Sequence, residues 1–353
     1  MSPTMTAAVL HGARDVRIET VPRPELRRGM ALLRVRRVGM CGSDLHYFQH
    51  GYCAGFVPTR PFVLGHELSA TVEAVADDVT GLVAGARVAV NPARACDHCR
   101  YCRSGRRNLC RSTVMLGSAS TKPPTDGAFA QWLAIRADQC HVLPDGLDDG
   151  VGAMLEPFAV ALHAVRRAGH LSASRVLVTG GGTIGLLAAM TARAFGAGLV
   201  VVSDVLPERR TTALRLGADA ALDPTDPQLP ARAAELAGDG FDVVVEAAGA
   251  RPALRQAFDL VRPGGTIVQV GTLGTEDVPL PANQLMTREI TFLGSFRYGD
   301  VFDDAIRLAA AGRVDLAALV SEVFPLAEAA QALTRAADPG SVIKVQIQVE
   351  ENV

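Results

Sequence analysis

Four of the seven cysteines lie between Cys96 and Cys110, in the pattern C-x2-C-x2-C-x7-C. Four thiolates at this spacing can surround one tetrahedral zinc ion and leave no open position for a substrate, as structural zinc sites do. Disulfides are the alternative, and so is a zinc ribbon for nucleic acid, although ribbons have two C-x2-C pairs about 15–20 residues apart. The sequence predicts a structural zinc centre on Cys96, Cys99, Cys102 and Cys110.

The segment from about residue 92 to 112, here called the cysteine lobe, is also rich in arginine. These side chains would encourage the nucleic-acid interpretation, but they can equally offset the negative charge of four thiolates or form a solvated surface. They are Arg100, Arg103, Arg106, Arg107 and Arg111.

Three further potential metal ligands are scattered over the first half of the chain. Cys41 lies in a glycine-flanked loop, His66 in the sequence LGHE, and Glu156 in MLEPF. Each of them alone has a simpler interpretation. Cys41 could be a small buried apolar residue, and His66 a hydrogen-bonded core histidine. Glu156 could interact favourably with the dipole of a helix that begins at Pro157. Together, sulfur, nitrogen and oxygen ligands with room for a fourth group predict a catalytic zinc site.

The stretch from Arg175 to Asp204 has the pattern of a dinucleotide site. A β-branched strand ends at Thr179, a G-x-G-x-x-G turn opens an apolar helix, and a second strand, Leu199–Ser203, ends at Asp204. Such a turn lets the backbone approach a pyrophosphate, and the acid about 20 residues on accepts from a ribose hydroxyl. The residues of this turn that are expected to bind the cofactor are Gly180, Gly182, Thr183, Ile184 and Gly185.

The elements that must position these residues change in character near residue 155. Before it the chain has short β-branched strands separated by glycine and proline, at 32–38, 70–76 and 87–90. After it, helices and strands alternate, which predicts a doubly wound parallel sheet and an α/β fold overall. The strands are predicted at 242–246, 266–270 and 290–294, and the helices at 158–167, 186–195 and 253–260.

This change of character predicts that the chain is divided into three segments. We expect a mainly β catalytic domain over residues 1–155, a Rossmann domain over 156–295, and a return of 296–353 to the first domain. The return contains a predicted helix at 303–311 and a final strand at 342–349.

Composition excludes several classes of protein. A net charge of −2 argues against a general nucleic-acid or membrane surface, and the 48% hydrophobic content is ample for two cores. Neither a signal peptide nor an apolar run of membrane-spanning length is visible, so the chain is expected to be cytoplasmic, without membrane or nucleic-acid partners.

Taken together, the two cysteine patterns, LGHE, the glycine turn and LEPF resemble the zinc-dependent medium-chain alcohol and polyol dehydrogenases over about residues 7–349. Within that superfamily CGSDLHYFQHG, NPARACDHC, LGSAS, LEPFAVALHAV and GSFRY are most similar to L-idonate 5-dehydrogenases, then to sorbitol and xylitol dehydrogenases. The resemblance implies a GroES-like catalytic domain around a Rossmann domain, with two zinc ions per chain. It also implies a homodimer or homotetramer.

Carried onto this sequence, the resemblance places catalytic zinc on Cys41, His66 and Glu156, with Glu67 as a supporting group or transient ligand. Zinc lowers the pKa of an alcohol, whose hydride passes to the nicotinamide. Ser43 and His46 match the proton-relay positions, although a turn hydroxyl and a surface imidazole are equally good interpretations of them.

The cofactor is expected to be NAD, because the charge of Asp204 would repel the 2′-phosphate of NADP. Arg209, with Arg210, could soften this preference. Five further residues, at the ends of the next two strands of the sheet, are expected to lie along the cofactor: Glu246, Ala247, Gly249, Val270 and Gly271.

The substrate is expected to be L-idonate, oxidised at C5 to 5-keto-gluconate, with sorbitol or xylitol as the alternative. The guanidinium of Arg297 can donate two parallel hydrogen bonds to the carboxylate of a sugar acid. The alternative is that Arg297 forms an ion pair within the protein. Tyr47 and Tyr298 can contact a polyhydroxylated chain. A dinucleotide-binding protein without catalysis stays open as a different class of function.

Overall fold

The computed structural model describes residues 3–338, 340 and 342–349. The chain forms two compact units, Met1–Glu156 with Phe302–Val353, and Pro157–Val301. The sequence places these divisions near residues 155 and 295. In the described part of the chain, no helix combines the length and hydropathy needed to span a bilayer.

The first unit is built on a seven-stranded sheet in the order β10-β6-β5-β3-β18-β17, with β9 also paired to β3. A smaller sheet has the order β2-β1-β4. The core contains side chains from both sheets. The strands are β1 (Thr4–Gly12), β2 (Asp15–Pro22), β3 (Met30–Gly39), β4 (Phe62–Val63), β5 (Glu67–Val75), β6 (Arg87–Val90), β9 (Trp132–Arg136), β10 (Cys140–Val142), β17 (Val320–Pro325) and β18 (Lys344–Gln348).

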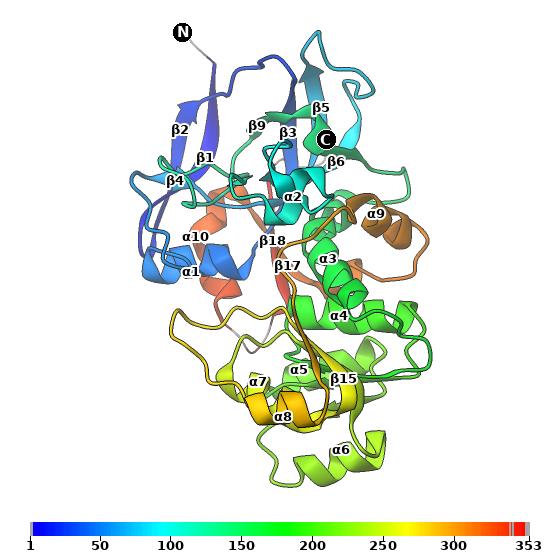
Figure 1. The fold of residues 1–353 in the computed structure, drawn as a ribbon. Helices are drawn as coiled ribbons and strands as arrows, with labels where there is room; N and C mark the ends of the chain where they lie inside the picture. Colours follow the sequence, from blue (N-terminus) through cyan, green and yellow to red (C-terminus); the bar gives the residue numbers. More distant parts are fainter. Residues whose placement is uncertain (1–2, 339, 341, 350–353) are drawn as a thin grey trace. The chain divides into compact units, whose positions relative to one another are not determined.

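The C-terminal segment completes this sheet. β18, red in Figure 1, pairs antiparallel with the blue strand β3 and parallel with β17. Residues from the two ends of the chain therefore become neighbours in one sheet. Outside the cysteine lobe, the helices that lie wholly within this unit are α1 (Gly42–His50), α9 (Phe302–Ala310) and α10 (Ala329–Ala336), with 3-10 turns η2 (Ala137–Gln139), η3 (Ala317–Leu319) and η4 (Leu326–Glu328).

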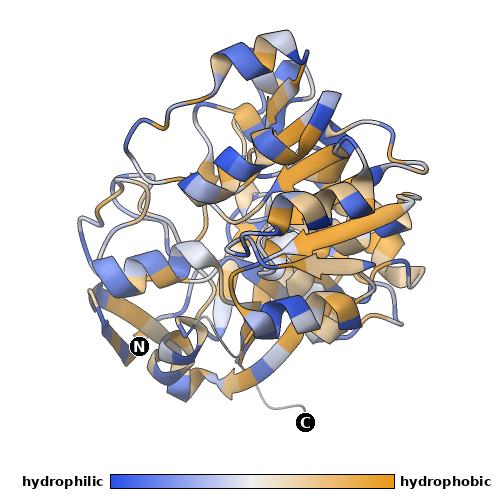
Figure 2. Cartoon of the chain, turned by 90° about the horizontal axis from the view of Figure 1, so that it is seen from below, coloured by the Kyte–Doolittle hydropathy of each residue, from blue (hydrophilic) through white to orange (hydrophobic). Residues whose placement is uncertain are grey.

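The second unit is a six-stranded parallel sheet in the order β13-β12-β11-β14-β15-β16, the doubly wound arrangement that the alternating pattern predicts. Its central strands are apolar along their length, as the orange arrows in Figure 2 show, because helices cover both faces of such a sheet. The strands are β11 (Arg175–Thr179), β12 (Leu199–Ser203), β13 (Ala220–Leu222), β14 (Phe241–Glu246), β15 (Val261–Gln269) and β16 (Thr291–Gly294). The helices are α4 (Thr183–Ala194), α5 (Pro207–Arg215), α6 (Leu229–Ala237), α7 (Arg251–Leu260) and α8 (Ala282–Thr287).

One predicted helix boundary is wrong. The sequence suggests a helix that begins after Pro157, whereas α3 runs from Asp149 to Arg167 with this proline inside it. Asp148 supplies the earlier start, because its carboxylate accepts from the backbone N–H of Val151 at 2.7 Å. The proline costs one backbone hydrogen bond, which the well-buried helix tolerates.

Candidate functional site

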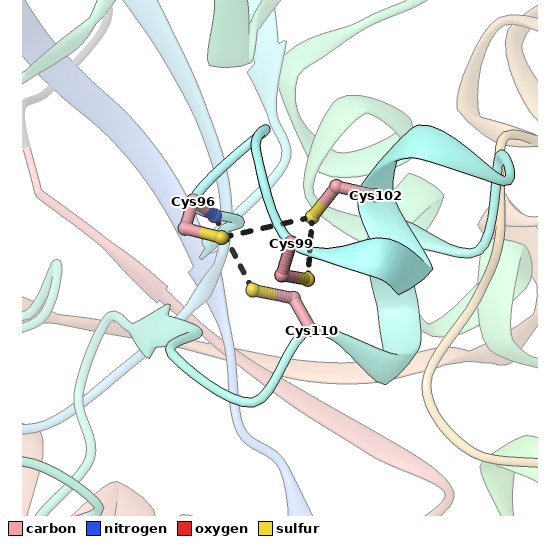
Figure 3. Close-up of side chains that lie close together, drawn as sticks. All are labelled: Cys96, Cys99, Cys102 and Cys110. Atoms are coloured by element: carbon pink, nitrogen blue, oxygen red, sulfur yellow. Dashed lines mark hydrogen bonds between the residues drawn. The ribbon is translucent and has the colours of Figure 1, made fainter.

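The cysteine lobe folds around its four thiols. The backbone forms α2 (Arg100–Arg103), η1 (Arg107–Leu109) and a small β7–β8 pair (Ala93–Arg94 with Val114–Met115). Figure 3 shows the four side chains pointing toward one another. The sulfur of Cys102 lies 4.0 Å from that of Cys96 and 3.5 Å from that of Cys99. Sulfur ligands of a tetrahedral zinc ion are about 3.8 Å apart for a Zn–S bond of about 2.3 Å. The donor set and its spacing therefore fit a closed zinc centre.

Protonation of the lobe thiols supports the same conclusion. Burial alone would raise the pKa of Cys110, but the backbone N–H groups of Cys96 and Ser112 stabilise its thiolate and lower that pKa to about 6. Burial and neighbouring thiols raise the pKa of Cys102 to about 12. Four crowded sulfurs cannot all ionise without a cation, so a divalent ion would relieve this conflict.

Two arginines near the lobe are engaged in ion pairs. Arg107 lies 2.6 Å from Asp97, and Arg136, in β9, lies 3.3 Å from the same carboxylate. Asp97 thus links the lobe to the main sheet.

The second candidate centre is assembled from separate elements. Cys41 is the residue before α1, and His66 and Glu67 stand at the start of β5. One ligand atom from each of these three residues lies within 4.8 Å of the others. Sulfur, imidazole nitrogen and carboxylate oxygen are zinc ligands, so the arrangement fits a catalytic ion with an open position.

Asp44 supports His66 and was not singled out by the sequence. Its buried carboxylate accepts from the backbone N–H groups of Cys41 and Gly65, at 2.9 and 3.1 Å. One oxygen also faces Nδ1 of His66 at 3.8 Å, and this nitrogen has no hydrogen-bond partner among the described residues. Burial disfavours a charged His66, but Asp44 and Cys41 outweigh it and raise the pKa of His66 well above its ordinary value. Asp44 thus orients the imidazole so that Nε2 is available to a metal.

Lys344 is a second supporting residue that the sequence analysis missed. It is only 3% exposed, and its Nζ donates to Glu67 Oε2 at 2.7 Å and to the carbonyl of Met40 at 2.8 Å. Burial opposes the ammonium form, yet the charge of Glu67 raises the pKa of Lys344. A lysine is rarely fully buried without a partner. Its place in the apolar run VIKVQI was the available signal.

Glu156 lies on α3 and is buried, but it is outside the group formed by Cys41, His66 and Glu67. Its charge acts on both His66 and Lys344, which places it beside this centre. Its ligand role therefore remains a prediction, with Glu67 the nearer carboxylate in this structure.

Helix α1 carries three of the predicted site residues. Ser43 and His46 stand one turn apart on it, and His46 is exposed beside His50. Tyr47 points into the core instead, where its ring packs on Phe62 and its hydroxyl accepts from the Ala119 N–H at 3.0 Å. This position fits packing better than the substrate contact that the sequence suggests.

In the second unit, the glycine turn joins β11 to α4. Gly180 has φ +91°, and an added Cβ would lie 2.8 Å from the backbone of Ala248. At Gly185 a Cβ would lie 1.8 Å from the Gly180 carbonyl oxygen. Both positions therefore require glycine, as a turn that presents backbone N–H groups to a pyrophosphate does. Thr183 and Ile184 form the first turn of α4.

Asp204 follows β12 and is held by the backbone. Its carboxylate accepts from Gly181 N–H at 2.7 Å and Leu206 N–H at 2.8 Å, and Arg209 lies 3.6 Å away. The guanidinium of Arg210 donates a hydrogen bond to the backbone carbonyl of Asp204, so this side chain is less available to a ligand.

The remaining cofactor candidates lie at the same carboxyl edge of the parallel sheet. Ala247 donates to the carbonyl of Thr179, while Val270 and Gly271 donate to that of Glu246. Arg297 follows β16 with a φ of +52°, and its guanidinium lies over the Phe296 ring at 4.9 Å. Tyr298 beside it is buried. Ligands of doubly wound folds bind at this edge.

Comparison with known proteins shows which family the chain resembles. Residues 183–311 match the zinc-binding dehydrogenases and residues 27–145 match the alcohol dehydrogenase GroES-like domain. Sorbitol dehydrogenase of Bacillus subtilis (strain 168) is 37% identical over 94% of this chain and 93% of its own length.

Two solved structures are also similar. The crystal structure of L-idonate 5-dehydrogenase from Escherichia coli K-12 has a TM-score of 0.92 at 33% identity, covering 99% of both chains. A putative zinc-binding dehydrogenase from Sinorhizobium meliloti 1021, bound to NADP, has a TM-score of 0.89 at 32% identity and covers 99% of this chain and 100% of its own.

Proposed function

The chain belongs to the zinc-binding medium-chain dehydrogenases, and from this premise we propose that it oxidises L-idonate at C5 to 5-keto-gluconate with NAD. The coarser activity, an NAD(P)-dependent zinc alcohol or polyol dehydrogenase, follows from the family. The choice of a sugar acid rests on one observation. Arg297 follows the last strand of the parallel sheet, at the edge where such sheets bind ligands, and it carries a guanidinium group.

Cys41 and His66 would hold the catalytic zinc together with Glu156 or Glu67. When bound, zinc supplies a Lewis acid that lowers the pKa of the substrate hydroxyl. Asp44 keeps the His66 ring oriented. We assign Ser43 and His46 to carry the alcohol proton to solvent, because they stand one turn apart on α1 and His46 is exposed.

The glycine turn and Asp204 would bind the dinucleotide, with the pyrophosphate at the N-terminus of α4 and a ribose hydroxyl donating to Asp204. The relative bound to NADP makes cofactor choice a real question. Asp204 favours NAD through its charge, and Arg209 is the side chain that could weaken this preference.

The substrate proposal is tested with an NAD-coupled panel of idonate, gluconate, sorbitol, xylitol and short alcohols. We expect the highest kcat/KM with idonate. Arg297→Ala should lower kcat/KM for idonate about 10–100-fold, the value of a charge-assisted pair, and change sorbitol turnover little. Arg215→Ala, at an exposed position on α5, is the matched control.

The alternative is a sorbitol or xylitol dehydrogenase, favoured by the similarity to sorbitol dehydrogenase. Comparable efficiency on sorbitol and idonate would support it. Equal loss of both activities in Arg297→Ala would also contradict the acid-specific proposal, because a carboxylate contact must matter more for the acid.

A further inference from the structure

A cavity of about 400 Å³ lies in the first unit, outside the metal centres and the dinucleotide turn. It is bounded by β3, β17, β18 and the first turn of α3. Its volume is within the range of small-molecule sites. Its polar lining includes Arg36, Arg37, Arg87, Asp148, Asp149 and Gln346.

Two of the three arginines are already engaged. Arg36 lies 3.4 Å from Asp149. Arg87 donates to the carbonyl of Leu147 at 2.6 Å and lies 3.9 Å from the same Asp149 carboxylate. The Asp148 carboxylate accepts a hydrogen bond from the backbone N–H of Val151 at the start of α3. Among the residues that the structure describes, Asp148 and Asp149 act on the charge of Arg37, at longer range than a direct ion pair.

A β-bulge places Arg36 and Arg37 at the same cavity. Successive side chains of a strand normally point to opposite faces. The register of β3 against β5 shifts between Val35 and Arg37, and a bulge of this kind re-aims a side chain. Both residues consequently line the cavity.

Within the described part of the chain, three buried polar atoms of the lining have no hydrogen-bond partner. Nη1 of Arg37 is a donor, whereas Oε1 of Gln346 and Oδ1 of Asp149 are acceptors. The Asp149 oxygen faces Arg87 at 3.9 Å, which leaves Arg37 and Gln346 to meet a ligand. The Gln346 side chain is fully buried, and its Nε2 donates to the Gly150 carbonyl at 2.9 Å, which leaves Oε1 as the unsatisfied end. A buried donor or acceptor without a partner is unfavourable, so a ligand that pairs with both groups would be stabilised there.

We propose that this cavity binds a small organic oxyanion with a hydroxyl group beside it. The oxyanion accepts from Arg37, and the hydroxyl donates to Gln346. A hydroxy acid and a polyol phosphate share this chemistry. The proposal is independent of the substrate proposed above, because it uses neither metal centre nor any residue of the second unit.

Calorimetric titration of the zinc-loaded full chain tests the proposal, with glycerate, glycerol 3-phosphate, acetate and glycerol as probes. We expect glycerate or glycerol 3-phosphate to bind at least about tenfold more tightly than acetate, and glycerol not to bind. The tighter of the two anions identifies the source of the oxyanion. If no anion binds up to about 10 mM, the cavity holds water only and the proposal fails.

Variants separate this cavity from the catalytic site, which could also bind hydroxylated probes. Arg37→Gln should weaken anion binding at least about tenfold while leaving turnover and melting temperature near those of the parent. Gln346→Leu should reduce glycerate affinity to that of acetate. Arg313→Gln, at an exposed position after α9, should change nothing. Unaltered binding in the Arg37→Gln and Gln346→Leu proteins would overturn the proposal.

Discussion

The two candidate zinc centres differ in how the chain builds them. The lobe takes its four ligands, all sulfur, from the short stretch between Cys96 and Cys110. The second centre draws Cys41 and His66 from the ends of separate elements and depends on Lys344, which is 277 positions beyond its partner Glu67. A local centre can be closed and structural, whereas a dispersed centre can keep an open position and gather supporting charges around it.

The largest effect is expected where the dispersed centre loses a ligand. Cys41→Ser should lower kcat by at least about 1,000-fold, because removing a group that stabilises developing charge costs several kcal/mol. Melting temperature should fall little, since the remaining elements stay packed. Steady-state kinetics and calorimetry on the same preparation measure both quantities. Near-normal turnover would contradict the assignment of this centre.

The opposite pattern is expected for the lobe. Cys96→Ser should remove one zinc per chain and lower the melting temperature, because metal binding at a structural site contributes folding free energy. A loss of about 3 kcal/mol corresponds to a shift of roughly 6–12 °C. Metal analysis with thermal unfolding checks this. A variant that keeps both ions and its stability would show that the lobe is not a zinc centre.

A smaller effect is expected when only the support of a ligand changes. Asp44→Asn keeps the size of the side chain but removes its charge beside His66. We expect a 10–100-fold loss in affinity for the catalytic zinc, as for other groups that orient a metal-binding histidine. Competition with a chelator measures this directly, and the lobe zinc should be unaffected. Equal loss of both ions would indicate general destabilisation instead.

The smallest effect concerns the other locally encoded site, the dinucleotide turn. Asp204→Ala should narrow the preference for NAD over NADP about tenfold in kcat/KM, because the carboxylate repels a 2′-phosphate. Arg209→Ala is the matched variant and should widen the preference. A parent enzyme that prefers NADP would remove Asp204 from this role.

Features encoded within a short stretch were predictable. The strands Arg87–Val90, Arg175–Thr179 and Leu199–Ser203 have the bounds that their apolar, β-branched runs suggest. The spacing of the four lobe cysteines already limits them to one ion. In the glycine turn, the residue type itself indicates that Gly180 and Gly185 have no room for a side chain. In each case the residues that interact are close in sequence, so residue type and spacing carry the information.

Other features were decided by tertiary contacts. The start of α3 depends on a cap by Asp148, and the core position of Tyr47 depends on Phe62 and Ala119. The pairing of Lys344 with Glu67 arises because β18 inserts between β3 and β17. A single sequence does not state which strand will lie beside which, and register alone decides whether a polar side chain meets a partner or faces water. The metal ligands could therefore be named from residue types, whereas the charges that orient them came only from the folded sheet.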